Sequence, residues 1–315
     1  MQQNVSRDGP VPSCTSIHGD VAVKKVLGKK HQQAAKEIFN ALLMDSQLNS
    51  RHLEVLSAKG CSAWLTALQL KEYGFQLNKP EFWEALALRY NWQLNAVPVT
   101  CVCGKSFTPD HAMICSHGGY PTIRHNELRD LNAALLTEVC HNVAIEPTLL
   151  PLDGETFTTL STNTSPDARA DFRATGFWTR GEEAYFDVRV FHPYASSYLS
   201  RALTDLFKQH EQLKRLEYQE RIVNIDQGSF TPLVFSTTGS GGQIAERFLQ
   251  RLAAKLAEND STSYSSVMAW LRCRTSFALL RSAILCIRGS RSTKKHPVYC
   301  DRELAIVESQ MAMDI

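Results

Sequence analysis

Between residues 122 and 240 the spacing of apolar residues changes repeatedly from that of a helix to that of a strand, and this alternation limits the possible folds most strongly. Leu128, Leu131 and Leu135 recur on one helical face, for example, whereas 184–191 has the pattern of a strand. The predicted order is helix 126–143, strands 143–150, 168–174 and 184–191, helix 195–221, and strand 230–236. This order predicts an α/β core in which helices flank a mixed sheet.

The segments around this core give the expected domain organisation. With 315 residues, of which 43% are hydrophobic, the chain can bury a sizeable core. We expect a flexible tail at 1–20, a helical region at 21–97, a Cys/His segment at 98–121, the α/β core at 122–240, C-terminal helices at 241–292 and a basic, flexible tail at 293–315. Neither a signal peptide nor a membrane span is predicted, so we expect the protein in the nucleus or the cytoplasm.

The Cys/His segment is too short to build a core of its own, and its composition favours a metal. It contains four soft or borderline ligands of the kind that tetrahedral Zn prefers. These are Cys101, Cys103, His111 and Cys115. The chain has nine cysteines, an odd number, which argues against a disulfide framework. We therefore expect a closed, structural zinc knuckle. Two alternatives remain: reduced cysteines beside a surface histidine, and His117 in place of His111.

Two aspartates lie on neighbouring predicted strands. Asp171 begins one strand and Asp187 lies on the next, so a hairpin can bring the two carboxylates together. Because side chains alternate along a strand, Asp187 and Arg189 point to the same face. A charged pair on a strand of the core is costly unless it is paired or bound to metal. Carboxylates that hold Mg or Mn would suit phosphodiester hydrolysis, and a plain ion pair is the alternative.

The helix that follows presents three polar residues on one face. His210, Lys214 and Tyr218 are spaced i, i+4, i+8. Lys214 is placed to approach a scissile phosphate. A solvated polar face is the alternative for this stripe.

Seven motifs together resemble a known family. They are Cys101-x-Cys103-Gly-x-x-Phe-x-x-x-His111-x-x-x-Cys115, Gly118-Gly119, Arg124-His125-Asn126-Glu127-x-Arg129-Asp130, Ala168-Arg-Ala-Asp171, Phe186-Asp-Val-Arg-Val-Phe-His-Pro193, His210-Glu-x-x-Lys214-x-x-x-Tyr218 and Gly228-Ser-Phe-Thr-Pro-Leu-Val-Phe-Ser236. This set resembles the C-terminal region of non-LTR-type retrotransposon reverse transcriptase proteins, which carries a CCHC zinc knuckle and a restriction-enzyme-like endonuclease. The match spans residues 55 to 292.

The resemblance implies a PD-(D/E)xK restriction-endonuclease-like fold that nicks target DNA, so that a reverse transcriptase can prime synthesis there. By motif position, Asp171 and Asp187 are the metal-binding acids, and Lys214 with Tyr218 matches the helical Lys and Tyr of the family. The implied cofactors are structural Zn and catalytic Mg or Mn. The implied partners are DNA, RNA and a reverse transcriptase, and no membrane.

The sequence departs from the pattern at two places. Arg189 stands where the general class has Lys, and a permanently protonated Arg can hold charge but cannot act as a base. Ala170 precedes Asp171 where the class has Pro, while a Pro166-Asp167 pair lies four residues upstream. Glu127 is a further candidate metal ligand, although an acid favoured by the helix dipole is the alternative.

A non-catalytic DNA-binding module is the competing prediction. The net charge is only +2, so any basic surface must be local. Such a module would bind phosphates by charge alone, through the zinc knuckle and the arginines of the C-terminal helix. These are Arg272, Arg274, Arg281 and Arg288. An inert transposon remnant is a third possibility.

Overall fold

The structure of the chain, a computed structural model, describes residues 33, 37, 49–67, 71–150 and 169–290. The tails predicted at 1–20 and 293–315 lie outside these residues. Contacts divide the chain after Leu53, and the description that follows concerns the unit that begins at Glu54. The helices and strands, in chain order, are α2 Ser50–Ser57, α3 Ala63–Thr66, η1 Lys71–Tyr73, α4 Lys79–Tyr90, α5 Pro109–Ile114, α6 Tyr120–Thr137, β1 His141–Ile145, β2 Phe172–Thr175, β3 Glu183–Phe191, η3 Ser196–Tyr198, α7 Leu203–Asn224, β4 Ser229–Ser236, α8 Gln243–Asn259 and α9 Tyr264–Arg288.

The four strands form one mixed sheet in the order β1-β2-β3-β4. Strands β1, β2 and β3 are antiparallel, with Phe172 opposite Phe186. Strand β4 runs parallel to β3, with Ala184 beside Ser229. A parallel neighbour needs a crossover connection, and α7 supplies it. The predicted α/β class, a mixed sheet flanked by helices, is therefore confirmed.

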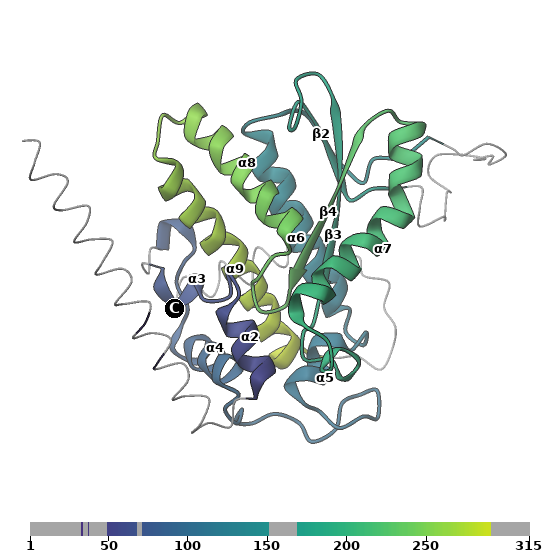
Figure 1. Cartoon of the computed structure of the whole chain (residues 1–315). Helices are drawn as coiled ribbons and strands as arrows, with labels where there is room; N and C mark the ends of the chain where they lie inside the picture. The colour runs from purple at the N-terminus through teal and green to yellow at the C-terminus, as the bar shows by residue number, and fades with distance from the viewer. Residues whose placement is uncertain (1–32, 34–36, 38–48, 68–70, 151–168, 291–315) are drawn as a thin grey trace, which may run out of the picture. The chain divides into compact units, whose positions relative to one another are not determined.

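Helices cover both faces of the sheet (Figure 1). Phe186 of β3 packs against Phe248 of α8, with ring centroids 5.3 Å apart. Tyr185, the preceding residue, packs instead with Tyr218 of α7. Successive side chains of a strand point to opposite faces, so Asp187 shares the α7 face with Tyr185. The alternation predicted for this strand is thus present in the structure.

Helix α6 begins at Tyr120, whereas the sequence predicted a helix from residue 126. Gly119 is its N-cap residue and has φ 72°, a conformation that glycine adopts without strain. Pro121 follows in the first turn, where its missing N–H costs nothing. The apolar stripe begins after this Gly-Tyr-Pro start signal, so the stripe alone predicts a start that is too late.

Helix α9 packs against α6 and α8, and also against the short helices α3, α4 and α5. Phe277 of α9 stacks on Phe75, with ring centroids 5.1 Å apart. The helix therefore joins the N-terminal helical segments to the α/β core. No helix in the described part of the chain is both long and apolar enough to span a lipid bilayer.

The arginines of α9 are bonded within the protein. Each donates a hydrogen bond to another described segment: Arg272, Arg274, Arg281 and Arg288. Arg281, for example, donates to the carbonyl oxygens of Gly74 and Gln76 at 2.6 and 3.0 Å. Arg272 pairs with Glu246 at 2.8 Å. These contacts give the arginines a structural role and disfavour the idea that they grip phosphates.

Candidate functional site

Four potential metal ligands lie together in the segment before α6. Their donor atoms all lie within 4.8 Å of one another, and we call them the Cys/His cluster: Cys101, Cys103, His111 and Cys115. The Sγ atoms of Cys101 and Cys115 are 3.8 Å apart, and Cys103 Sγ lies 3.2 Å from His111 Nε2. Two sulfurs bound to one tetrahedral Zn lie about 3.8 Å apart, given Zn–S bonds of about 2.3 Å. The cluster can therefore hold a metal such as zinc.

A tight turn and a short helix bring the four ligands together. The Gly104 N–H donates to the Cys101 carbonyl at 2.8 Å, and Gly104 has φ 84°, which closes the turn between the first two cysteines. Thr108 then caps α5, because its hydroxyl accepts the His111 N–H at 3.0 Å. Cys115 ends α5, so the helix carries one ligand near each end.

The alternative ligand His117 is outside the cluster. Its Nδ1 lies 4.0 Å from Cys115 Sγ, and it does not meet the other donor atoms. A hydrogen bond from the Lys105 N–H lowers the pKa of the Cys103 thiol, which favours the thiolate that binds metal. Burial raises the pKa of Cys115. The geometry thus favours His111 as the fourth ligand.

His192, directly after β3, joins the Cys/His segment to the sheet. Its Nε2 lies 2.9 Å from Asp110 Oδ1 in α5, and its Nδ1 lies 2.8 Å from Thr237 Oγ1 after β4. The ring is buried and both of its nitrogens are used. Ile287 of α9 packs on the same segment from another side. The Cys/His segment is therefore fixed to the α/β core by polar and apolar contacts.

Asp171 is held just before β2 by two contacts. Its Oδ2 accepts the Val188 N–H of β3 at 2.5 Å, and its Oδ1 lies 3.0 Å from His125 Nε2 in α6. Burial lowers the pKa of His125, but the hydrogen bond to Asp171 and the charges of Asp171 and Asp187 outweigh burial, so the pKa is raised.

Asp187 lies on β3 between Phe186, whose carbonyl accepts the Asp171 N–H, and Val188, whose N–H donates to the Asp171 carboxylate, and we call Asp171 and Asp187 the aspartate pair. Asp187 is only 3% exposed. Lys214 Nζ of α7 lies 3.1 Å from Asp187 Oδ2 and 3.0 Å from Glu217 Oε2. Burial and the charge of Asp171 raise the pKa of Asp187 to about 7, although Lys214 opposes this shift. Two carboxylates in one site disfavour each other's ionisation, which a cation would relieve.

Tyr218 and Arg189 lie beside this pair. The ring of Tyr218 has its centroid 5.1 Å from Lys214 Nζ, and burial raises the pKa of its hydroxyl, which stays protonated. Arg189 is exposed on β3, on the face that carries Asp187.

Glu127 does not join the aspartate pair. The carboxylate of this exposed residue on α6 accepts a hydrogen bond from the Ser282 hydroxyl of α9. Desolvation of the carboxylate raises the pKa of Glu127, and the hydrogen bond from Ser282 opposes this shift. It also lies in the third turn of α6. The helix dipole favours an acid only near the helix start, so this alternative does not explain Glu127 either. Its contacts instead support packing of α6 on α9.

The chemistry of the aspartate pair fits a hard divalent cation in part. Carboxylate oxygens are the ligands that Mg and Mn prefer. Asp187 Oδ2 is buried and, among the described residues, has an ion-pair partner but no aligned hydrogen-bond donor, so it can accept a further bond. In the described part of the chain, however, only the Cys/His cluster brings three or more His, Cys, Asp or Glu donor atoms within 4.8 Å. Two protein ligands plus water and substrate oxygens would complete such a site.

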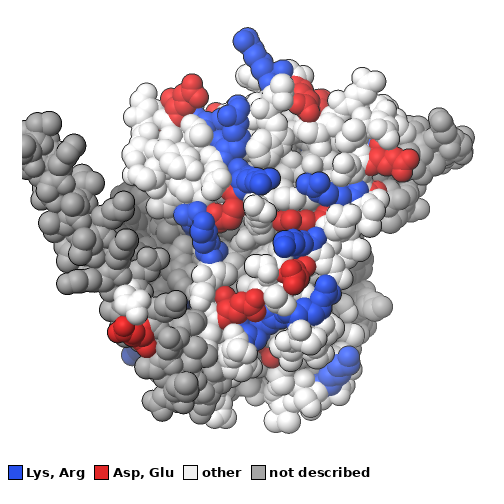
Figure 2. All heavy atoms as spheres, viewed as in Figure 1, with Lys and Arg blue, Asp and Glu red and all other residues white. Residues whose placement is uncertain are grey.

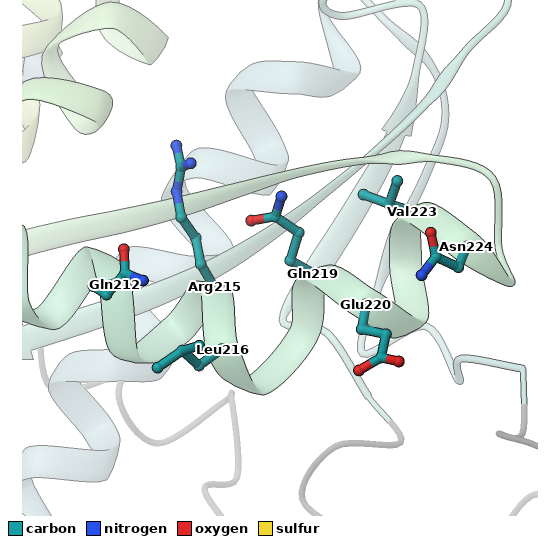
Figure 3. A pocket seen from close by; sticks show the side chains of 7 residues that line it. All are labelled: Gln212, Arg215, Leu216, Gln219, Glu220, Val223 and Asn224. Atoms are coloured by element: carbon teal, nitrogen blue, oxygen red, sulfur yellow. The ribbon is translucent and has the colours of Figure 1, made fainter.

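One face of the molecule has mixed charge. Figure 2 shows Lys and Arg side chains interspersed with Asp and Glu on the face in view. A hollow of about 440 Å³ runs along α7 and is lined by that helix alone (Figure 3). Its lining residues are Gln212, Arg215, Leu216, Gln219, Glu220, Val223 and Asn224. None of them belongs to the aspartate pair or its contacts described above, so this hollow is separate from the candidate site.

No protein-family model matches the chain, and no curated protein matches it in sequence. The site geometry is therefore the observation that bears on function.

Proposed function

We propose that this protein is a metal-dependent DNA endonuclease derived from a retrotransposon, with a restriction-endonuclease-like core that nicks its target. The observation that carries the proposal is the convergence of Asp171, Asp187 and Lys214 where β2, β3 and α7 meet. The order helix, three antiparallel strands, crossover helix and parallel strand is compatible with such a core and supports the proposal. DNA is the proposed substrate, with RNA and a reverse transcriptase as further partners in the nucleus.

In this proposal the aspartate pair holds Mg or Mn. The bound metal would lower the pKa of a water and stabilise charge on the phosphate. His125 orients the carboxylate of Asp171 from α6, and Val188 fixes its other oxygen. Lys214 lies beside Asp187 and would neutralise negative charge that develops on the phosphate. Tyr218 supports the Lys214 ammonium through its ring.

A nicking assay on supercoiled plasmid with Mg or Mn tests the proposal. We expect the wild type to nick, and Lys214→Ala and Asp187→Asn to lose at least about 100-fold in rate, because the first removes a positive charge beside the phosphate and the second removes an anionic metal ligand. Lys208→Ala is the matched control, since Lys208 is an exposed lysine of the same helix. Circular dichroism and zinc content must first show that all variants fold. Equal nicking by all four proteins would refute the assignment.

A DNA-binding module without catalysis is the second candidate. The direct ion pair between Lys214 and Asp187 favours it, because such a pair satisfies both charges without metal. In that case the wild type binds DNA with a steep salt dependence but does not nick it. Binding without cleavage, retained in Asp187→Asn, would select this candidate.

A further inference from the structure

Arg189 lies between two contacts that join β3 to α7. On one side, Asp187 of β3 meets Lys214; on the other, the ring of Phe191 lies 4.7 Å from the ring of His210. Side chains alternate along a strand, so Asp187, Arg189 and Phe191 point to the same face, the one that α7 covers. Arg189 therefore lies on the strip of β3 that faces His210 and Lys214.

Arg189 has no ion-pair or hydrogen-bond partner within the described ranges 49–67, 71–150 and 169–290. It is exposed, which leaves its guanidinium free to meet a ligand. An arginine on a strand beside a buried carboxylate normally pairs with it, but here Lys214 has that place. The charge of Arg189 is thus not used by the fold that the structure describes.

His210 is buried beside Arg189 with one nitrogen unsatisfied. The residue is 4% exposed, and its Nε2 has no hydrogen-bond partner among the described residues. Its ring is held by Phe191 and, edge to face at 5.6 Å, by Tyr198. Burial first, and then the charges of Arg189 and Arg201, lower the pKa of His210 to about 4. The open Nε2 of His210 and the exposed guanidinium of Arg189, on the strand face that packs on the His210 ring, together offer donors and positive charge suited to an anion.

We propose that Arg189, Arg201 and His210 form a second phosphate subsite for the DNA strand, next to the aspartate pair. The inference rests on the proposed function and deepens it, because it says how the strand is held during cleavage. Arg201 comes from the loop just before α7, where its side chain donates to Gln209 Oε1 at 2.5 Å. Guanidinium groups bind phosphate oxygens in a planar, two-point geometry. The nucleotide one step from the scissile bond would supply that phosphate.

DNA binding in buffer without added divalent metal tests the subsite separately from cleavage. The probe is a short fluorescent duplex, measured by anisotropy over a series of salt concentrations. Arg189→Gln should weaken binding by about 5- to 10-fold and reduce the slope of log K against log salt by about 0.9, the value for one lost phosphate contact. Arg215→Gln, an exposed arginine on the outer side of α7, is the matched control. Arg189→Lys should restore most of the slope.

Inorganic phosphate provides a second readout. In the full-length protein it should shift the His210 ring resonances in the wild type and not in Arg189→Gln. An unchanged salt slope in Arg189→Gln, or equal effects of Arg189→Gln and Arg215→Gln, would overturn the subsite. If the wild type nicks but Arg189→Gln behaves as the control, the endonuclease stands without this subsite. If binding depends on Arg189 and no nicking occurs, the subsite stands and the endonuclease fails.

Discussion

The buried carboxylate of Asp187 should cost the protein stability as pH rises, and Asp187→Asn should remove this cost. Folding raises the pKa of Asp187 from 3.8 to about 7, so the folded protein keeps a proton that the unfolded chain has already released. This contribution is fully present below the unfolded pKa and is lost as pH rises through the folded pKa. Three pKa units correspond to about 4 kcal/mol, of which about 2 to 3 kcal/mol falls between about pH 5 and about pH 8.

Asparagine preserves the shape of the side chain, and Lys214 keeps Glu217 as its partner at 3.0 Å. Relative to the wild type, Asp187→Asn should therefore gain about 2 to 3 kcal/mol of unfolding free energy between about pH 5 and about pH 8. The other titrating groups occur in both proteins, so the pH dependence that they give the unfolding free energy largely cancels in the difference. Urea unfolding followed by circular dichroism measures the difference, with Asp205→Asn, an exposed carboxylate of α7, as control.

A difference between Asp187→Asn and the wild type that does not change with pH would refute this reasoning. A second measurement separates the cost of burial from the proposed metal site. Adding Mg at about pH 8 should raise the unfolding midpoint of the wild type, because a ligand that binds only the folded state stabilises it. The same addition should not affect Asp187→Asn.

Three further predictions concern the rest of the molecule. Cys103→Ser should release the metal and lower the melting temperature, whereas Cys273→Ser should keep a full metal content in elemental analysis; equal metal content would contradict the knuckle. Phe248→Ala should lower the unfolding free energy by about 3 to 5 kcal/mol in urea, because this fully buried ring packs on the sheet; a loss below about 1 kcal/mol would contradict that packing. Arg281→Ala should lose about 1 to 3 kcal/mol by leaving the Gly74 carbonyl without its donor, yet retain wild-type DNA affinity; weakened binding would return α9 to the DNA interface.

The sequence predicted the elements of the core because their patterns are local. The strand predicted at 184–191 is β3 Glu183–Phe191, and the C-terminal helices predicted within 241–292 are α8 Gln243–Asn259 and α9 Tyr264–Arg288. Alternation along β3 also placed Asp187 and Arg189 on one face correctly. In each case the apolar pattern decides the type of element; for α8 it also decides the buried side, whereas β3 is buried on both faces.

Contacts between segments that are distant in the sequence are harder to predict from it. His125 and Asp171 are 46 residues apart, and their meeting depends on how α6 crosses the sheet. Glu217, by contrast, lies three residues after Lys214 on the same helix, so its ion pair could have been predicted from spacing. The sequence offered Glu127 as a ligand because of its motif, but the direction of its side chain follows from the packing of α6 on α9.

The contacts of His192 bear on how this protein can change by recombination. Its ring bonds to Asp110 in the Cys/His segment and to Thr237 after β4, so three stretches of sequence meet at one buried side chain. A knuckle taken from another protein would leave a buried imidazole nitrogen without its acceptor unless an equivalent of Asp110 came with it. The two parts are therefore expected to be inherited as one piece, and their unfolding should be cooperative, so that metal affinity and the stability of the sheet rise and fall together.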